Sequence, residues 1–306
     1  MSKGVVMFLS QYKEKDVVMA RDILQPFYLA GPQVRGRMVC LDGALKAILA
    51  GHGYPERVEG LLAEAVTLSA LLAGMLKFAG VFTLQVRGDG PVSLLVAQVT
   101  NDGHMRAYAR FDEAVLAGVP ENLAGLCGQG DMLLSLDPGE DGMERYQGVV
   151  ALEGETLAAC TRHYFQQSEQ VDTDFAIHSV RDGDGVSSGG IMIQRLPREG
   201  GQGEGDAAAA AEDWRRVGIL LSTVRAQELV SKTLSPSEVV FRLFHEEDPT
   251  FHPEMLLEAK CRCSHKRVLD MLKAMPEEER PGAGGEEISV TCSFCGKTYT
   301  FSKKEI

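Results

Sequence analysis

The sequence predicts an α+β fold with an N-terminal core of antiparallel sheet packed with helices, a helical linker and a small C-terminal domain. Short apolar runs between residues 81 and 151 alternate with Gly- and Asp-rich turns, which is typical of antiparallel strands. A Gly-rich charged stretch then precedes two amphipathic segments, and four of the seven cysteines fall in the last 46 residues. We therefore divide the chain into a core (1–196), a linker (197–250) and a C-terminal domain (251–306).

The composition indicates an acidic protein with a sizeable core. Of the 306 residues, 44% are hydrophobic and 24% are charged, and the formal net charge is −12. An acidic chain repels phosphate backbones, which disfavours nucleic acid as a partner. The apolar run Val5–Leu9 is too short for a secretory signal, and no stretch reaches the roughly 18–20 apolar residues that cross a bilayer. We expect a cytoplasmic protein with no membrane partner.

The first elements are a strand and two helices. Gln33–Leu41 is rich in apolar and β-forming residues, and Asp42–Ala50 follows as a short helix. Tyr54–Ala79 has apolar residues at helical spacing, with Pro55 in the first turn and Gly80 as a stop signal. The pattern predicts a long core helix.

An antiparallel meander follows this helix. Val81–Val86 and Val92–Thr100 are separated by the turn signal Gly88-Asp89-Gly90-Pro91, and Asn101-Asp102-Gly103 predicts a hairpin leading into His104–Phe111. Further strands and one helix complete the predicted core: strands Met132–Leu136 and Tyr146–Ala151, helix Ala158–Glu169, and strands Phe175–Val180 and Gly190–Leu196.

The linker begins with a flexible connector, Pro197–Asp206, and continues as two helices. The first covers Ala207–Val230 and contains Gly218, which weakens a helix by about 1 kcal/mol relative to Ala. The second starts at Ser235-Pro236-Ser237-Glu238, a capping box with Pro at the first position. Both helices carry apolar stripes that we expect to pack on the core in the resting state: Trp214, Val217, Leu220, Leu221, Val224, Val239, Val240, Leu243 and Phe244.

Two cysteine pairs in the tail have the spacing of a zinc site. Cys261-Arg262-Cys263 is followed after 28 residues by Cys292-Ser293-Phe294-Cys295. Alternating residues before and after the second pair predict a hairpin, with Gly296 permitting the tight turn. Cysteines two apart on extended chain point the same way, and a helix can begin after them at Ser264. We expect one Zn²⁺ on Cys261, Cys263, Cys292 and Cys295.

The cysteines alone leave the role of this metal open. The tail is too small to fold without a staple, and a structural zinc supplies on the order of 10 kcal/mol of folding free energy. A permanent staple without a regulatory role is therefore one interpretation, and His265 is an alternative ligand. Nearby cations favour thiolates over thiols: Lys260, Arg262, Lys266, Arg267 and Lys297. Cys40, Cys127 and Cys160 stand apart in sequence and are expected to be small core residues.

Two other functional classes share parts of this pattern. A thiol oxidoreductase also uses Cys-x-x-Cys, but at a helix start in a βαβ unit. A zinc-ribbon nucleic-acid binder would use the basic residues Lys297, Lys303 and Lys304, but the chain as a whole is acidic. No Ser/His/Asp arrangement or carboxylate pair stands out, so we do not expect an enzyme.

Several segments in one order resemble a single known family. They are Val34-Arg35-Gly36, HGYPERVEGLLAEAVTLSALLAGMLKFAG from His52, TLQVRGDGP from Thr83, NDGHMRAYAR from Asn101, YFQQSEQ from Tyr164, GGIMIQRLP from Gly189 and FRLFHEED from Phe241. Together with the tail cysteines, these segments resemble the 33-kDa heat-shock family of redox-regulated chaperones along nearly the whole chain. The first ~25 residues match less well, and Pro197–Asp206 and Ala207–Ala211 are peculiar to this sequence.

The resemblance implies a redox-switched, ATP-independent holdase. In the reduced state the four tail cysteines would hold zinc and the protein would be inactive. Oxidation would form the disulfides Cys261–Cys263 and Cys292–Cys295, release zinc, unfold the tail and destabilise the linker. The protein would then form a homodimer and bind unfolding client proteins. We expect the linker stripes to supply the client or dimer surface: Trp214, Val217, Leu220, Leu221, Val224, Val240, Leu243 and Phe244.

Overall fold

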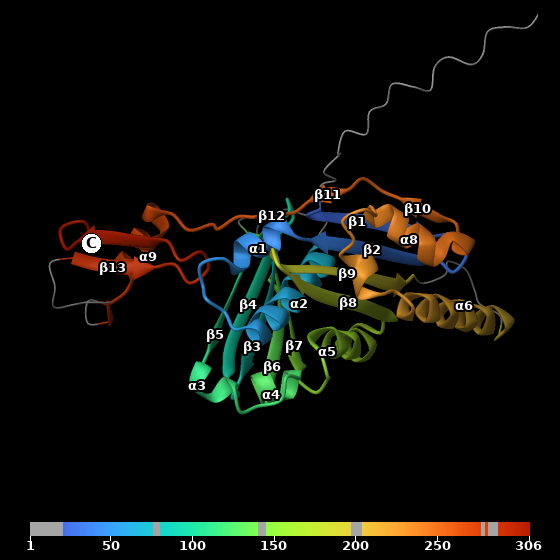
Figure 1. The fold of residues 1–306 in the computed structure, drawn as a ribbon, viewed down its shortest axis with the longest axis horizontal. Coiled ribbons are helices and arrows are strands. Elements are labelled where there is room, and N and C mark those ends of the chain that lie inside the picture. The colour runs from blue at the N-terminus through green and yellow to red at the C-terminus, as the bar shows by residue number, and fades with distance from the viewer. Residues whose placement is uncertain (1–20, 76–79, 140–144, 197–203, 277–278, 281–286) are drawn as a thin grey trace, which may run out of the picture.

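The computed structural model describes residues 21–75, 80–139, 145–196, 204–276, 279–280 and 287–306. Within these residues the strands form two six-stranded sheets and a separate C-terminal hairpin. Helix α2 (Glu56–Ala73) lies between the two sheets and contacts strands of both (Figure 1). Thirteen of its 18 residues are buried, so α2 is a core helix on nearly every face. The predicted α+β class is confirmed.

The first sheet has the order β10-β1-β2-β9-β8, with β11 also pairing β1, and the second has the order β12-β5-β4-β3-β6-β7. All pairs are antiparallel except β12 with β5. The strands are β1 (Ile23–Leu29), β2 (Val34–Leu41), β3 (Val81–Gly88), β4 (Val92–Thr100), β5 (His104–Phe111), β6 (Gly130–Asp137), β7 (Tyr146–Ala151), β8 (Thr173–Asp182), β9 (Gly185–Arg195), β10 (Pro249–Phe251), β11 (Met255–Leu256) and β12 (Glu258–Ala259).

Short helices complete the core. They are α1 (Gly43–Leu49), α3 (Glu113–Leu116), α4 (Leu123–Cys127) and α5 (Leu157–Tyr164), which continues into a π-helical turn at Phe165–Glu169. The predicted end of the long helix at Gly80 is wrong, because α2 stops at Ala73 with Gly74 as its C-cap. Pro55 is the N-cap of α2 and not a first-turn residue. Within the described residues no helix has the length and apolar character needed to span a bilayer.

The linker helices cover the face of the first sheet that α2 does not occupy. They are α6 (Glu204–Ser222), α7 (Ala226–Leu229) and α8 (Pro236–Phe244). Their buried residues form a hydrophobic cluster with Phe27, Val34, Met38 and Ile191 of the sheet. Phe27 and Phe244 stack at a centroid distance of 5.8 Å. Each face of the first sheet therefore has its own hydrophobic core.

The linker differs from its prediction in two places. The predicted helix Ala207–Val230 is broken after Ser222, where the Thr223 hydroxyl donates to the Leu220 carbonyl at 2.7 Å and competes with the helical hydrogen bonds. Glu204–Asp206, expected in the connector, belong to α6, and the rest of the connector lies outside the described residues. The capping box is confirmed, since Ser235 and Glu238 each accept a hydrogen bond from the other's backbone N–H.

Residues 249–260, which we call the strap, connect the linker helices to the C-terminal unit at the opposite end of the molecule (Figure 1). Strands β10 and β11 pair with β1 of the first sheet, and β12 pairs with β5 of the second. The Lys260 amide donates to the Met105 carbonyl at 2.9 Å, so the strap stays attached up to the residue before Cys261. The strap thus crosses both sheets.

Candidate metal centre

The C-terminal unit is a hairpin packed against one helix. Strands β13 (Glu287–Thr291) and β14 (Thr298–Ser302) flank the second cysteine pair, and α9 (His265–Ala274) follows the first pair with Ser264 as its N-cap. Gly296 has φ +68°, a left-handed conformation that glycine adopts readily. The predicted strand–turn–strand arrangement and helix start are confirmed. The Cys-x-x-Cys lies in this hairpin and not at a helix start, which removes the context of a thiol oxidoreductase.

The apolar core of this unit is small. In the described part of the unit it consists of Leu272, Ile288, Tyr299 and Phe301, with a few partly buried neighbours. Four buried side chains cannot balance the conformational entropy lost by a unit of this size, so a further stabilising interaction is required.

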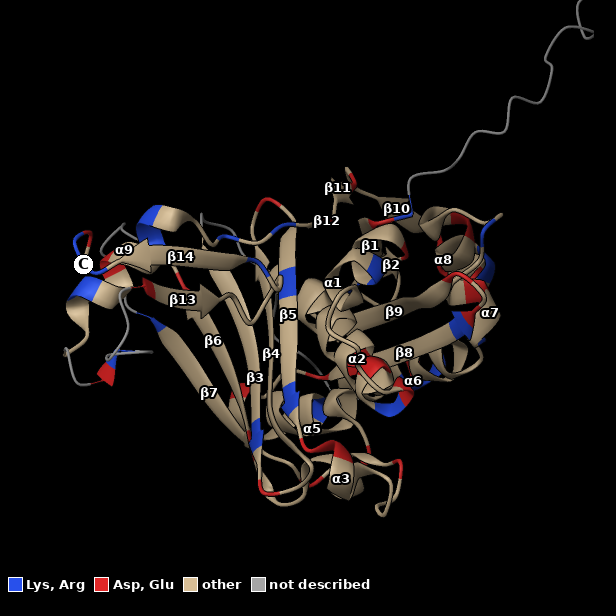
Figure 2. Cartoon of the chain, turned by 60° about the vertical axis from the view of Figure 1, so that its left-hand side comes forward, with Lys and Arg blue, Asp and Glu red and all other residues tan. Residues whose placement is uncertain are grey.

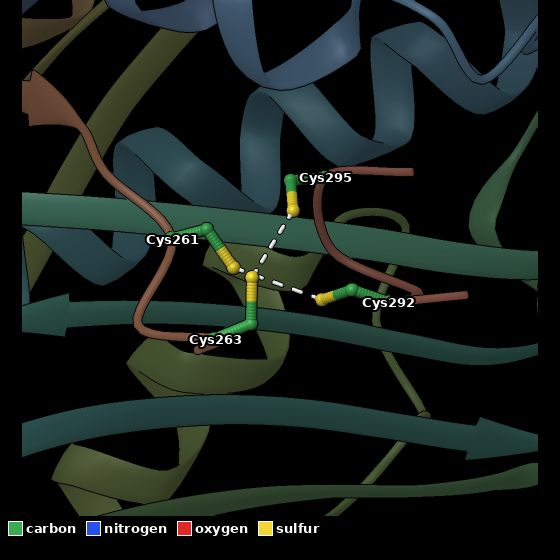
Figure 3. Close-up of side chains that lie close together, drawn as sticks. All are labelled: Cys261, Cys263, Cys292 and Cys295. Atoms are coloured by element: carbon green, nitrogen blue, oxygen red, sulfur yellow. Dashed lines mark hydrogen bonds between the residues drawn. The ribbon is translucent and has the colours of Figure 1, made fainter. Parts of the chain in front are cut away.

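The four cysteines supply the geometry for that interaction. Their Sγ atoms all lie within 4.8 Å of one another, and Figure 3 shows the four side chains pointing toward a common centre. The Sγ–Sγ distance is 3.7 Å from Cys261 to Cys292 and 3.4 Å from Cys263 to Cys295. A tetrahedral zinc with Zn–S bonds of about 2.3 Å places its sulfurs roughly 3.8 Å apart. The site therefore fits a tetrahedral metal ion.

His265 is not part of this cluster. Its ring lies 4.5 Å from the Phe301 ring and 6.4 Å from the Tyr299 ring, so it packs on the small core. Among the described residues, the group that could hold a metal consists of the four cysteines. Four thiolates complete a tetrahedral set without the histidine.

Hydrogen bonds and burial shift the pKa values of Cys261 and Cys295 in opposite directions. Burial alone would raise the pKa of Cys261, but hydrogen bonds from the Cys263 backbone and from the neighbouring thiols outweigh burial and lower that pKa to about 7. Burial and the neighbouring thiols raise the pKa of Cys295 to about 12. The Tyr299 hydroxyl also donates to Cys263 Sγ at 3.1 Å. One thiolate thus forms readily, and a bound cation is needed to hold all four sulfurs deprotonated.

The metal centre is docked on the second sheet through Phe294, which lies between the second pair of cysteines. Its ring meets Tyr108 edge-on at 4.7 Å, and the Arg106 guanidinium lies 4.0 Å from the ring centroid. The His52 ring nitrogen Nε2 is 3.2 Å from the Phe294 carbonyl oxygen. Arg106 also places Nη1 4.0 Å from Cys261 Sγ. An arginine of β5 therefore faces both the docked ring and the cysteine cluster.

The basic residues expected around the cysteines have other contacts. Arg262 donates to Gln98 Oε1 at 2.7 Å, Lys260 contacts His104 at 3.1 Å, and Lys297 lies over the Tyr299 ring. The contribution of Arg106 was not predicted. Arg106 lies in a segment far from the cysteines in sequence. The family resemblance included this segment, NDGHMRAYAR, but nothing in the sequence linked it to the metal site.

The linker residues predicted to form a client or dimer surface are in the resting core. Val217, Leu221, Val224, Val240 and Phe244 are buried against the first sheet. Trp214, Leu220 and Leu243 are partly buried in the same cluster. Ile219 and Phe241, on the outer sides of α6 and α8, are instead 50% and 55% exposed.

The remaining cysteines are embedded in the N-terminal core. Burial raises the pKa of both Cys40 and Cys127 to about 12, and it also raises the pKa of Cys160. A rise from 9.0 to about 12 lowers the thiolate fraction at pH 8 about a thousandfold, and thiolate is the reactive species.

We expect iodoacetamide at pH 8, with a chelator present, to alkylate the four tail cysteines and leave Cys40, Cys127 and Cys160 unmodified. Mass spectrometry of tryptic peptides gives the readout. Guanidinium unfolding is the control and should allow modification of all seven. Alkylation of Cys127 in the folded protein at the rate of the tail cysteines would contradict burial as the cause.

Comparisons with known proteins agree on one family. A family model described as Hsp33 protein matches residues 22–302. The chain is 39% identical over 290 residues to the 33 kDa chaperonins of Salmonella typhi and Escherichia coli O7:K1, covering 93% of this chain and 94% of each relative. A crystal structure of the 33 kDa chaperonin from Thermotoga maritima matches with a TM-score of 0.75 at 22% identity, over 93% of this chain and 96% of that one.

Proposed function

This chain belongs to the Hsp33 family of chaperones, and on that premise we propose that it is an ATP-independent holdase switched on by oxidation of a zinc-bound cysteine cluster. The observation that carries the proposal is the convergence of four thiols within 4.8 Å in a unit with almost no core of its own. All-sulfur tetrahedral sites select zinc over hard cations such as Mg²⁺ or Ca²⁺. When bound, zinc supplies a fixed centre that holds the four thiolates together.

Oxidation acts on the thiolates of Cys261, Cys263, Cys292 and Cys295. Each disulfide forms by loss of two electrons from two thiolates. Hydrogen peroxide accepts those electrons with two protons and leaves as two waters, so two equivalents oxidise all four sulfurs. Because disulfide sulfur is a poor ligand, the oxidised cysteines no longer retain the metal.

We propose Cys261–Cys263 and Cys292–Cys295 as the disulfides. Each pair lies within a segment of three or four residues, so its two sulfurs stay near each other as the unit loosens during oxidation. The shortest sulfur–sulfur distances in the folded unit run instead from Cys261 to Cys292 and from Cys263 to Cys295. Peptide mapping of the oxidised protein distinguishes the two patterns.

Loss of the C-terminal unit is transmitted to the linker through the strap. We propose three functional regions, with residues 1–196 as core, 197–250 as linker and 251–306 as switch, and the strap crosses the last boundary. Release of α6–α8 would expose both the linker stripes and the sheet residues beneath them: Trp214, Val217, Leu220, Leu221, Val224, Val240, Leu243 and Phe244 on the linker, and Phe27, Leu29, Val34, Met38, Ile191 and Ile193 on the sheet. A newly exposed apolar area of this kind binds unfolding clients or a second copy of the chain.

The partners and location follow from the same chemistry. We propose unfolding proteins as clients and a homodimer in the oxidised state. We propose the cytoplasm as its location, because cysteines that must stay reduced in the inactive state need a reducing compartment.

The test measures zinc content and suppression of client aggregation on one sample, before and after peroxide treatment. We expect about one zinc per chain to be lost as suppression appears, and reductant with zinc to reverse both changes. Retention of zinc through oxidation, or its loss without any gain in suppression, would leave the metal as a permanent staple.

A further inference from the structure

The second sheet has an outer face that points away from the hydrophobic core. Along β4, Leu95, Ala97 and Val99 are fully buried in the core, so the alternate residues lie on the opposite face. Figure 2 shows α1 and α2 on one side of β3–β7 and β13 and β14 on the other. The outer face thus meets the C-terminal unit and not the core helices.

One cross-strand row on this face is mainly apolar. The strand registers pair Tyr108 with Val96, Val96 with Gln85, Gln85 with Leu133, and Leu133 with Val149. We call these five residues the outer row. Val149 is 66% exposed, and Tyr108, Gln85 and Leu133 are partly exposed, whereas Val96 is buried. Four of the five residues are therefore at least partly accessible to a partner.

The Tyr108 end of the outer row already holds an aromatic ring. Phe294 packs edge-on against Tyr108 at 4.7 Å and lies under the Arg106 guanidinium at 4.0 Å. Tyr108 can pack edge-to-face with any aromatic ring, and Arg106 can make a cation–π contact with any aromatic ring. Neither contact depends on which segment carries the ring. The chain therefore supplies its own occupant for this end of the row.

Charge around Tyr108 favours a particular kind of partner. Arg106 and Arg110 lie two residues before and after Tyr108 on β5 and share its face of the sheet. Figure 2 shows that β5 carries basic positions, drawn in blue. A segment that places an acidic residue beside an aromatic one would pair its carboxylate with either guanidinium while the ring contacts Tyr108.

We propose that the outer row is a binding surface for aromatic side chains of unfolding proteins, and that Phe294 occupies its Tyr108 end while the metal centre is intact. This inference rests on the proposed function and adds a second client surface, on a different sheet from the linker helices. Unfolding of the C-terminal unit removes Phe294 and opens the row in the same event that releases the linker.

The experiment uses the full-length, reduced, zinc-loaded protein. The probe is a fluorescein-labelled 12-residue peptide with two Phe–Glu pairs, and a matched peptide carries Ser in place of each Phe. Fluorescence anisotropy gives the dissociation constant. We expect Phe294→Ala to tighten binding of the Phe peptide on the order of tenfold relative to the unaltered protein. Ser293→Ala, in the same loop and exposed, is the matched control and should leave binding unchanged.

A second substitution tests whether the peptide uses the outer row. In the Phe294→Ala background, Tyr108→Ala should weaken binding to the level of the Ser peptide, whereas Tyr108→Phe keeps the ring and should retain the affinity. Zinc content near one per chain in every variant verifies that the metal centre remains folded.

Equal peptide affinity of Phe294→Ala and the unaltered protein would overturn the proposal, as would binding that is insensitive to Tyr108→Ala. Dimerisation of reduced Phe294→Ala in sedimentation velocity would also overturn it, by making a second copy the occupant. The proposed function fails by a separate result, namely oxidised protein that suppresses no aggregation, whereas the peptide measurement is made entirely on reduced protein.

Discussion

Replacement of Cys263 and Cys295 by serine is expected to abolish metal binding and unfold residues 261–306 while both large sheets remain folded. Among the described residues of the C-terminal unit, the buried core consists of Leu272, Ile288, Tyr299 and Phe301. A structural zinc site contributes about 10–16 kcal/mol, far more than this core can supply. Hydrogen exchange measured by mass spectrometry should show loss of amide protection in α9, β13 and β14 and retained protection in β2 and β9.

The matched control for this double variant is Cys40→Ser. Cys40 Sγ donates to the Leu229 carbonyl at 3.3 Å, and a serine hydroxyl can make the same bond. Zinc content and protection should therefore stay at the level of the unaltered protein. Protected β13 and β14 amides in the zinc-free double variant would show that the unit folds without its metal, and the switch would then need another trigger.

Phe244→Ala is expected to release the linker helices without oxidation. The Phe244 side chain is fully buried and stacks on Phe27 of the first sheet. Truncation of a buried phenylalanine costs about 3–5 kcal/mol, a large share of the roughly 5–15 kcal/mol that stabilises a typical native protein. The reduced variant should keep its zinc yet suppress client aggregation and bind a hydrophobic dye.

Phe241→Ala is the control on the same helix. Phe241 is 55% exposed, so its loss should change the free energy of unfolding by no more than about 0.5 kcal/mol and leave the reduced protein inactive. If Phe244→Ala remained inactive while α8 lost amide protection, the linker core would be excluded as the client surface.

The sequence predicted those features that depend on residues close together in the chain. The four tail cysteines, the hairpin turn at Gly296 and the capping box of α8 follow from spacing and residue type alone, and each is in place. Strand β1 was missed. It contains Pro26, which normally argues against a strand, but here the edge partners β10 and β11 pair with residues on either side of it.

The features that the sequence did not predict depend on contacts between distant segments. The strap consists of strands two or three residues long, which have no periodicity of their own, and they form because β1 and β5 offer free edges. Gly36 lies in a strand because the Phe27 ring occupies the space where a Cβ would stand. Docking of Phe294 on Arg106 and Tyr108 joins segments more than 180 residues apart. Neither local sequence predicts this contact.

The attachment of Lys260 to β5 sets the effective concentration of Phe294 near its docking site on Arg106 and Tyr108. While the strap stays paired with β5, an undocked Phe294 remains tethered 34 residues from Lys260, within a root-mean-square reach of roughly 30 Å. Such a tether corresponds to an effective concentration in the millimolar range. Re-docking is therefore a first-order process that proceeds equally well in dilute and concentrated protein, whereas formation of the proposed dimer depends on concentration. Reduction at low protein concentration should accordingly favour re-docking of Phe294 over the proposed dimer.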